Sequence, residues 1–153
     1  MTWREHVARR DYRAAFEVLG ERGMGEETAK AGTIEQLVML ADVARLSGHA
    51  RAAVAPLRRA AAMEGAAAAV AGYSLGRLLL DELREFGAAA TAIEGAIGKG
   101  LPGGLDEPAL ARLVEAHARA KHAADAKRWA EVYERKYPRG REVEAVRRWR
   151  AAR

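Results

Sequence analysis

Apolar residues recur at intervals of three and four positions along nearly the whole chain. This spacing places them on one face of an α-helix, whereas a half-buried strand would alternate apolar and polar residues. No stretch shows sustained alternation or the β-branched enrichment that is typical of a sheet. The pattern therefore predicts an all-α protein.

Residues that favour helix starts and ends divide this pattern into segments. Thr2 with Glu5, and Thr33 with Gln36, have the spacing of a capping box, in which two side chains satisfy free backbone N–H groups at a helix start. Asp106 followed by Pro108 indicates another start. Gly and Pro predict helix ends at Gly48, around Gly65, at 98–104 and at 138–140. We interpret residues 20–32, which contain four glycines, as a mobile loop.

Four segments along the chain resemble one another. DYRAAFEVL, HARAAVAPL, EFGAAATAI and HAADAKRWA align Ala15, Ala53, Ala89 and Ala126, at spacings of 38, 36 and 37 residues. A recurring helical segment at such a period is typical of repeat proteins, in which each helix pair buries its apolar face against the next. The alignment predicts four helix pairs.

The third pair carries the clearest family likeness. Leu75, Gly76 and Leu79 resemble the Leu-Gly-x-x-Tyr stretch of a tetratricopeptide repeat (TPR), and residues 89–96 resemble its second helix after one inserted residue near 81–83. The chain therefore resembles TPR proteins, and its 36 Ala and 21 Arg suggest a GC-rich bacterial genome. The resemblance implies one α-solenoid domain over 1–153, with helix pairs at about 1–22, 33–64, 66–98 and 106–138 and a capping helix at about 140–152.

The family likeness also implies a binding surface. In TPR proteins the first helix of each pair lines a groove that binds peptides or partner helices. The alignment transfers these groove positions to Asp42, Arg45, Tyr73, Ser74, Arg77, Arg112, Glu115 and Arg119. Their Arg-leaning character suits an acidic or C-terminal protein segment, although an ordinary solvated helix face is an equal alternative. We expect a non-enzymatic adaptor or scaffold module for protein–protein interaction.

The excess positive charge lies at the C-terminal end. Residues 1–134 hold 18 basic and 19 acidic side chains, whereas 135–153 hold 8 and 2. The basic tail, which we define as Arg139, Arg141, Arg147, Arg148 and Arg150, could bind nucleic acid or another acidic surface. The favoured interpretation is a docked helix, because residues 143, 146 and 149 form an apolar stripe.

Candidate chemistry is sparse. There is no Cys, and none of the four His forms the i, i+4 pair that sets two imidazoles on one helix face for zinc. His117 is expected in the core, and His122, five positions later, is expected to diverge from it. Ser47 and Ser74 have no evident His and carboxylate partners, and GKGLPGG at 98–104 lacks the strand and the Ser or Thr of a phosphate loop. We expect no catalytic residue, metal or cofactor.

No apolar run reaches the length of a signal peptide or of a bilayer-crossing helix. We therefore expect a cytoplasmic protein, or one domain of a longer envelope or regulatory protein. The oligomeric state stays open.

Overall fold

The computed structural model describes residues 1–153 and consists of nine α-helices and two short 3₁₀ helices, without strands. The all-α prediction is confirmed. The chain divides into two compact units, Met1–Met63 and Glu64–Arg153, which are described separately below. None of the helices combines the length and the apolar character that crossing a bilayer requires.

The first unit contains α1 (Trp3–Ala8), α2 (Tyr12–Lys30), α3 (Ile34–Leu46), η1 (Ala50–Ala53) and α4 (Val54–Ala61). Both predicted capping boxes are present, with Thr2 accepting from the Glu5 N–H and Thr33 from the Gln36 N–H. Consecutive helices pack together in this unit, and Leu37, Leu40 and Leu57 lie in its core. The 3₁₀ turn before α4 has a local cause, because Pro56 cannot donate to the carbonyl of Ala52 as an α-helix requires.

The predicted loop at residues 20–32 is wrong, because α2 continues to Lys30. Gly20 alone leaves the helical conformation, with φ of 65°, and makes a kink. Beyond the kink Met24 and Thr28 are buried one turn apart, and the Thr28 hydroxyl donates to the Met24 carbonyl at 2.7 Å. The Arg59 guanidinium donates to the carbonyls of Thr28 and Ala31 at the end of the helix. These tertiary contacts offset the low helix propensity of the glycines.

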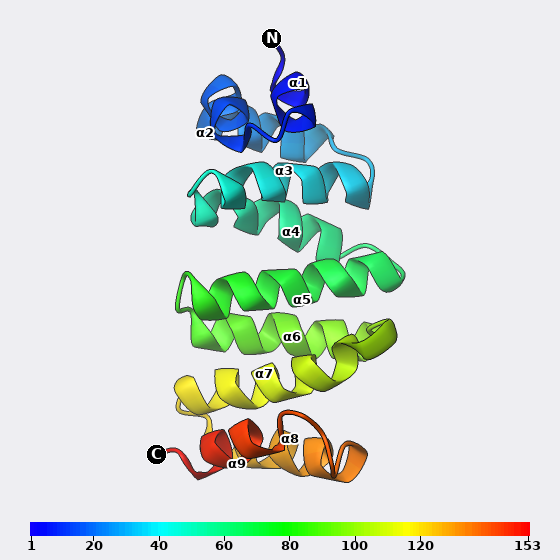
Figure 1. Cartoon of the computed structure of the whole chain (residues 1–153), viewed down its shortest axis with the longest axis vertical. Coiled ribbons are helices and arrows are strands. Elements are labelled where there is room, and N and C mark those ends of the chain that lie inside the picture. Colours follow the sequence, from blue (N-terminus) through cyan, green and yellow to red (C-terminus); the bar gives the residue numbers. More distant parts are fainter. The chain divides into compact units, whose positions relative to one another are not determined.

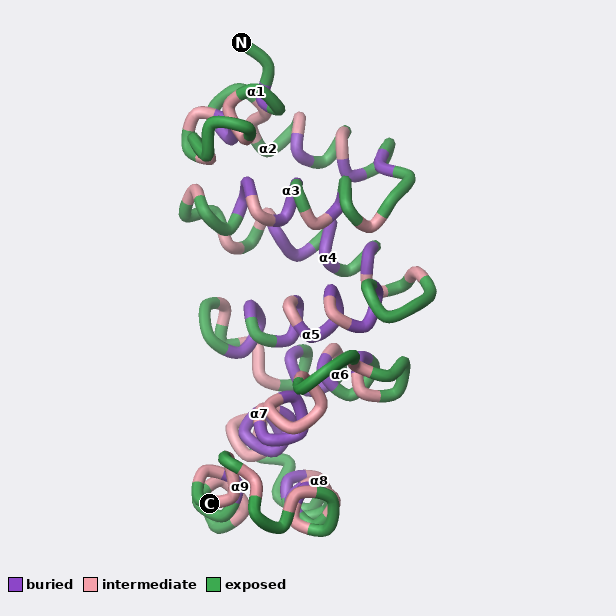
Figure 2. Tube along the Cα trace, turned by 45° about the vertical axis from the view of Figure 1, so that its right-hand side comes forward, coloured by how far each residue is buried: buried purple, intermediate pink, exposed green.

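The second unit contains α5 (Ala66–Asp81), α6 (Phe86–Lys99), η2 (Gly103–Leu105), α7 (Asp106–Arg119), α8 (Ala123–Lys136) and α9 (Val143–Ala151). Each helix from α5 to α8 packs on the next along the chain, and α9 packs on both α7 and α8 (Figure 1). Buried residues occur in every α-helix of this unit and are most frequent in α5 and α7 (Figure 2). The predicted connection at 98–104 is confirmed in part, because Gly98 and Lys99 still belong to α6 and the link to α7 is formed by residues 100–105, which include η2.

One backbone turn occurs four times along the chain. The residues with positive φ at these turns are Arg10, Gly48, Arg84 and Lys121, at spacings of 38, 36 and 37 residues. These are the spacings of the aligned alanines, each of which follows its turn by five residues. The residue directly after each positive-φ residue is the N-cap of the following helix. Its backbone angles are nearly the same each time, with φ between −92° and −114° and ψ between 59° and 80°. The predicted alignment therefore has a local structural counterpart.

The aligned alanines are all buried, with exposed fractions of 2 % or less. The predicted inserted residue in the third pair also has a counterpart. The turns after α1, α3 and α7 are each closed by a backbone N–H that donates to the carbonyl five residues earlier, as the Asp11 N–H does to His6. After α5, the Glu85 N–H donates instead to the carbonyl of Leu79, six residues earlier. The turn at Arg84 therefore accommodates one additional residue.

The C-terminal helix α9 is docked. Val146 is fully buried with Leu110, Val114 and Tyr133, and Val143 and Trp149 pack against the same cluster. The stripe predicted from the sequence therefore faces α7 and α8. The Tyr133 hydroxyl accepts from the Glu142 N–H at 2.9 Å, which fixes the start of α9.

Candidate functional site

Six of the eight predicted groove residues lie in the second unit, on α5 and α7. We call this set the α5–α7 face: Tyr73, Ser74, Arg77, Arg112, Glu115 and Arg119. The other two, Asp42 and Arg45, lie on α3 of the first unit, where their side chains form an ion pair at 3.3 Å. The candidate site described below is therefore the α5–α7 face alone.

Tyr73 and Arg77 are one helical turn apart on α5. Tyr73 is only 4 % exposed, and the Arg77 guanidinium lies over its ring at 4.8 Å from the centroid. Burial raises the pKa of Tyr73 above its usual value of 10, against the opposing effects of Arg77 and Arg112. Arg77 itself is exposed. The Tyr73 ring thus lies against the exposed guanidinium of Arg77, and this cation–π contact limits the conformational freedom of the Arg77 side chain.

Glu115 is the buried charge of the α5–α7 face, with an exposed fraction of 8 %. Arg112 approaches one of its oxygens at 3.0 Å, and Arg119 approaches the other at 2.9 Å. The 3- and 4-residue spacings from Glu115 place both arginines beside it on α7. Arg112 also pairs with Asp81 at the end of α5, so this network joins two helices.

Arg119 extends the same network toward the end of the chain. Its guanidinium lies 4.7 Å from the ring centroid of Phe86 on α6 and 5.7 Å from that of Trp149 on α9. Arg119 is therefore held by a carboxylate and two aromatic rings. Cation–π contacts of this kind add about 0.5 to 1 kcal/mol each where they are partly exposed.

The charges of the α5–α7 face are largely paired within the molecule. Arg112 and Arg119 are both bound to Glu115, whereas Arg77 is an exposed cation with its ring support. These internal contacts restrict the side chains of Arg112, Glu115 and Arg119. The one exposed cation of this face is the Arg77 guanidinium, which lies over the Tyr73 ring.

The basic tail is divided by the structure. Arg150 binds Glu134 at 3.2 Å and Glu131 at 3.4 Å on α8, so its charge contributes to docking. The other four arginines, Arg139, Arg141, Arg147 and Arg148, are exposed. These four are the tail residues whose side chains face solvent.

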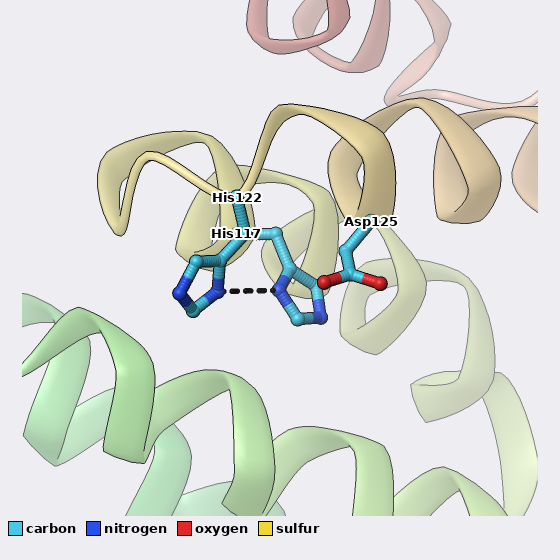
Figure 3. A group of neighbouring side chains, drawn as sticks. All are labelled: His117, His122 and Asp125. Carbon is cyan, nitrogen blue, oxygen red and sulfur yellow. Dashed lines mark hydrogen bonds between the residues drawn. The ribbon is translucent and has the colours of Figure 1, made fainter.

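The expectation that His117 and His122 diverge is wrong. Their Nδ1 atoms lie 3.3 Å apart, and Asp125 completes a cluster whose potential ligand atoms all lie within 4.8 Å of one another (Figure 3). His117 is buried in the core, as predicted, with an exposed fraction of 6 %. Burial, ahead of opposing effects from Asp125 and Glu94, lowers the pKa of His117 below 6.5 and favours a neutral imidazole.

The turn between α7 and α8 explains why residues five apart meet. The His122 N–H donates to the His117 carbonyl at 2.8 Å and the Lys121 N–H to the Ala118 carbonyl at 3.1 Å, which is the Schellman pattern. That motif brings together the side chains of its first and last residues, here the two imidazoles. Their divergence was predicted from the spacing of a continuous helix, whereas α7 ends at Arg119 and the chain turns between the two residues. The alignment of HAADAKRWA as a separate helix start is the signal for this turn.

Ser47 also has a His partner that the sequence reasoning did not find. Its hydroxyl lies 3.0 Å from His49 Nδ1 and 3.1 Å from the Ala44 carbonyl, and the His49 ring stacks on Phe16. The two residues are two positions apart in the turn after α3, next to the helix end predicted at Gly48. This pairing stabilises the turn.

Comparison with protein-family models, with curated proteins and with solved structures gives no match for this chain.

Proposed function

We propose that this chain is a TPR-like helical-repeat protein whose four helix pairs form one solenoid domain capped by α9, and that it binds a protein partner through the α5–α7 face. The observation that supports the proposal most is the recurrence of one turn at Arg10, Gly48, Arg84 and Lys121. Repeated local geometry at this period is expected when each helix pair buries its apolar face against its neighbour. The role is that of an adaptor or scaffold rather than of an enzyme.

The partner segment that suits this face is acidic. Arg77 offers an exposed guanidinium over the Tyr73 ring, and a guanidinium can bind a carboxylate with two parallel hydrogen bonds. Aromatic and Arg side chains at the centre of a contact commonly carry most of the binding free energy. Arg112 and Arg119 would hold the surrounding surface in place through Glu115.

The test is a comparison of proteins retained by the immobilised chain with those retained by Arg77→Glu, using quantitative mass spectrometry of the source lysate. Lys127→Glu is the matched control, because Lys127 is an exposed cation on α8 outside the face. We expect Arg77→Glu to lose at least one partner by more than tenfold and Lys127→Glu to keep it, since loss of a hot-spot residue costs about 2 kcal/mol or more and Arg is enriched at hot spots. Equal retention by all three forms would exclude the α5–α7 face.

Nucleic-acid binding is a second candidate function, supported by the four exposed arginines of the basic tail. Contacts of this kind release counterions, so affinity should fall steeply with salt. A double substitution, Arg147→Ala with Arg148→Ala, should weaken binding to a mixed-sequence DNA duplex. It should also reduce the slope of log affinity against log salt concentration by the amount expected for the loss of about two phosphate contacts. A gel shift at low salt without any complex would reject this candidate.

A further inference from the structure

The cluster at the junction of α7 and α8 has the donors of a metal site. His117 lies at the end of α7, His122 caps α8, and Asp125 lies in the first turn of α8 (Figure 3). Imidazole nitrogens and carboxylate oxygens are among the ordinary ligands of Zn²⁺. We propose that these three residues bind one Zn²⁺ ion, with water in the fourth position.

The spacing of the two imidazoles supports this assignment. Zn²⁺ binds His nitrogens at about 2.0 to 2.1 Å in tetrahedral geometry, which places two such ligands about 3.3 Å apart. The two Nδ1 atoms lie 3.3 Å apart. In the absence of metal, a single proton must lie between them, since one ring donates and the other accepts. An ion would replace that proton, and each ring would carry its hydrogen on Nε2.

The backbone holds this geometry before any ion arrives. The Schellman hydrogen bonds of Lys121 and His122 fix the turn, and the burial of His117 restricts its ring. The hydrogen bond that this ring makes is the one between its Nδ1 and His122 Nδ1, since its Nε2 is buried without a partner. Preorganised ligands lower the conformational cost of binding.

The local charge also favours a divalent cation. The groups that act on His117 are the carboxylates of Asp125 and Glu94 on one side and His122 and the guanidinium of Arg128 on the other. A metal-bound imidazole is neutral, so with His122 as a ligand the two carboxylates outnumber the one guanidinium. Arg128 binds Asp125 at 3.0 Å. An Asp125 oxygen already lies within 4.8 Å of the imidazole ligand atoms, so coordination would require it to move closer to the ion and to weaken its bond with Arg128. Arg128 is therefore a competitor of the ion.

The other turns of the same type provide an internal comparison. The turn after α1 brings His6 together with Asp11, and the turn after α3 brings Ala44 together with His49. The turn after α7 places an imidazole at both positions and adds a carboxylate three residues later. His6 is therefore the natural control residue, since it occupies the position of His117 in a turn with only one imidazole.

The experiment uses the full chain, treated with EDTA and dialysed, and titrated with ZnCl₂ by calorimetry. We expect one ion per chain and a rise in Tm that EDTA reverses, because an ion that binds only the folded state stabilises it. CoCl₂ should give the visible absorption of a four-coordinate site. Absence of any heat, Tm shift and Co²⁺ spectrum would overturn the proposal.

Variants distinguish this site from non-specific binding to surface histidines. His122→Ala and Asp125→Asn should each reduce Zn²⁺ affinity by more than about tenfold, since even the loss of an outer partner of a ligand costs 10- to 100-fold. His6→Ala should leave the affinity unchanged, and Arg128→Ala should increase it because Asp125 is released. His122 is exposed, so its removal should not unfold the chain. Binding that persists in His122→Ala and Asp125→Asn would overturn the proposal.

Discussion

Gly76 on α5 lies directly against Ile93 on α6. A methyl group added at residue 76 would overlap Ile93 Cγ1, and it would lie 3.1 Å from Cδ1 of the same side chain and 3.4 Å from the Ala89 carbonyl oxygen. The close approach of the two helices therefore depends on the missing side chain at Gly76. Small residues at a helix crossing allow the helix axes to come this near.

Gly76→Ala should lower the free energy of unfolding by about 1 to 3 kcal/mol, because Ile93 and the backbone of α6 would have to move. Gly95→Ala is the matched control, since Gly95 lies in the same helix as Ile93 with no atom within 4 Å of an added methyl group. That substitution should raise the free energy of unfolding by about 0.5 to 1 kcal/mol through helix propensity. Denaturant unfolding measures both, and a Gly76→Ala variant at least as stable as the wild type would contradict the close approach.

Glu115→Ala should lower the free energy of unfolding by about 2 kcal/mol or more, because Arg112 and Arg119 would lose the buried carboxylate that compensates them. The loss of unfolding free energy should be smaller than for a fully buried ion pair, since both arginine side chains are partly exposed to solvent. Glu144→Ala on the exposed side of α9 should change stability by less than about 0.5 kcal/mol. Equal effects of the two variants in denaturant unfolding would show that the network adds no stability.

Lys121→Gly should raise the free energy of unfolding by about 1 kcal/mol, because Lys121 has φ of 66°, where a Cβ atom is unfavourable. Lys127→Gly, in the interior of α8, should lower it by about 1 kcal/mol. Chemical denaturation measures the free energy of unfolding of both variants. The comparison tests the backbone conformation of the turn rather than contacts made by its side chains. Destabilisation by Lys121→Gly would mean that the left-handed turn is not formed there.

Asp106 and Tyr137 should titrate as a linked pair. The Tyr137 hydroxyl donates to Asp106 at 2.6 Å, which together with burial raises the pKa of Tyr137 to about 12. Burial alone would raise the pKa of Asp106, but hydrogen bonds from Lys136 and Tyr137 bring that pKa below 3.8. In Asp106→Asn, the midpoint of tyrosinate absorbance for Tyr137 should therefore move from about 12 toward 10.

The two shifts affect stability at opposite ends of the pH range. Because the pKa of Asp106 is lower in the folded state, its stabilising contribution is present above pH 3.8 and is lost as the pH falls through its folded pKa. Because the pKa of Tyr137 is higher in the folded state, stability falls as the pH rises from 10 toward 12. Unfolding curves of the wild type and Asp106→Asn should converge at low pH. Curves that stay parallel down to pH 2 would reject this linkage.

Predictions from the sequence were most accurate where a local rule governs the backbone. The capping boxes at Thr2 and Thr33 and the apolar stripe of α9 are as predicted, because neighbouring residues create both. The loop prediction for residues 20–32 was wrong because it depended on glycine content alone. The helix there is held by Arg59, which lies far away in the sequence.

The amino-acid order by itself determined the helical class, the helix starts and the register of the four aligned alanines, since each depends on residues within one or two turns. The tertiary structure decided which charges meet. It pairs Arg112 with Asp81 from another helix, places Arg119 between Phe86 and Trp149, and brings His117 against His122 by reversing the chain. These contacts depend on packing and on a left-handed residue at Lys121, for which helical spacing contains no signal.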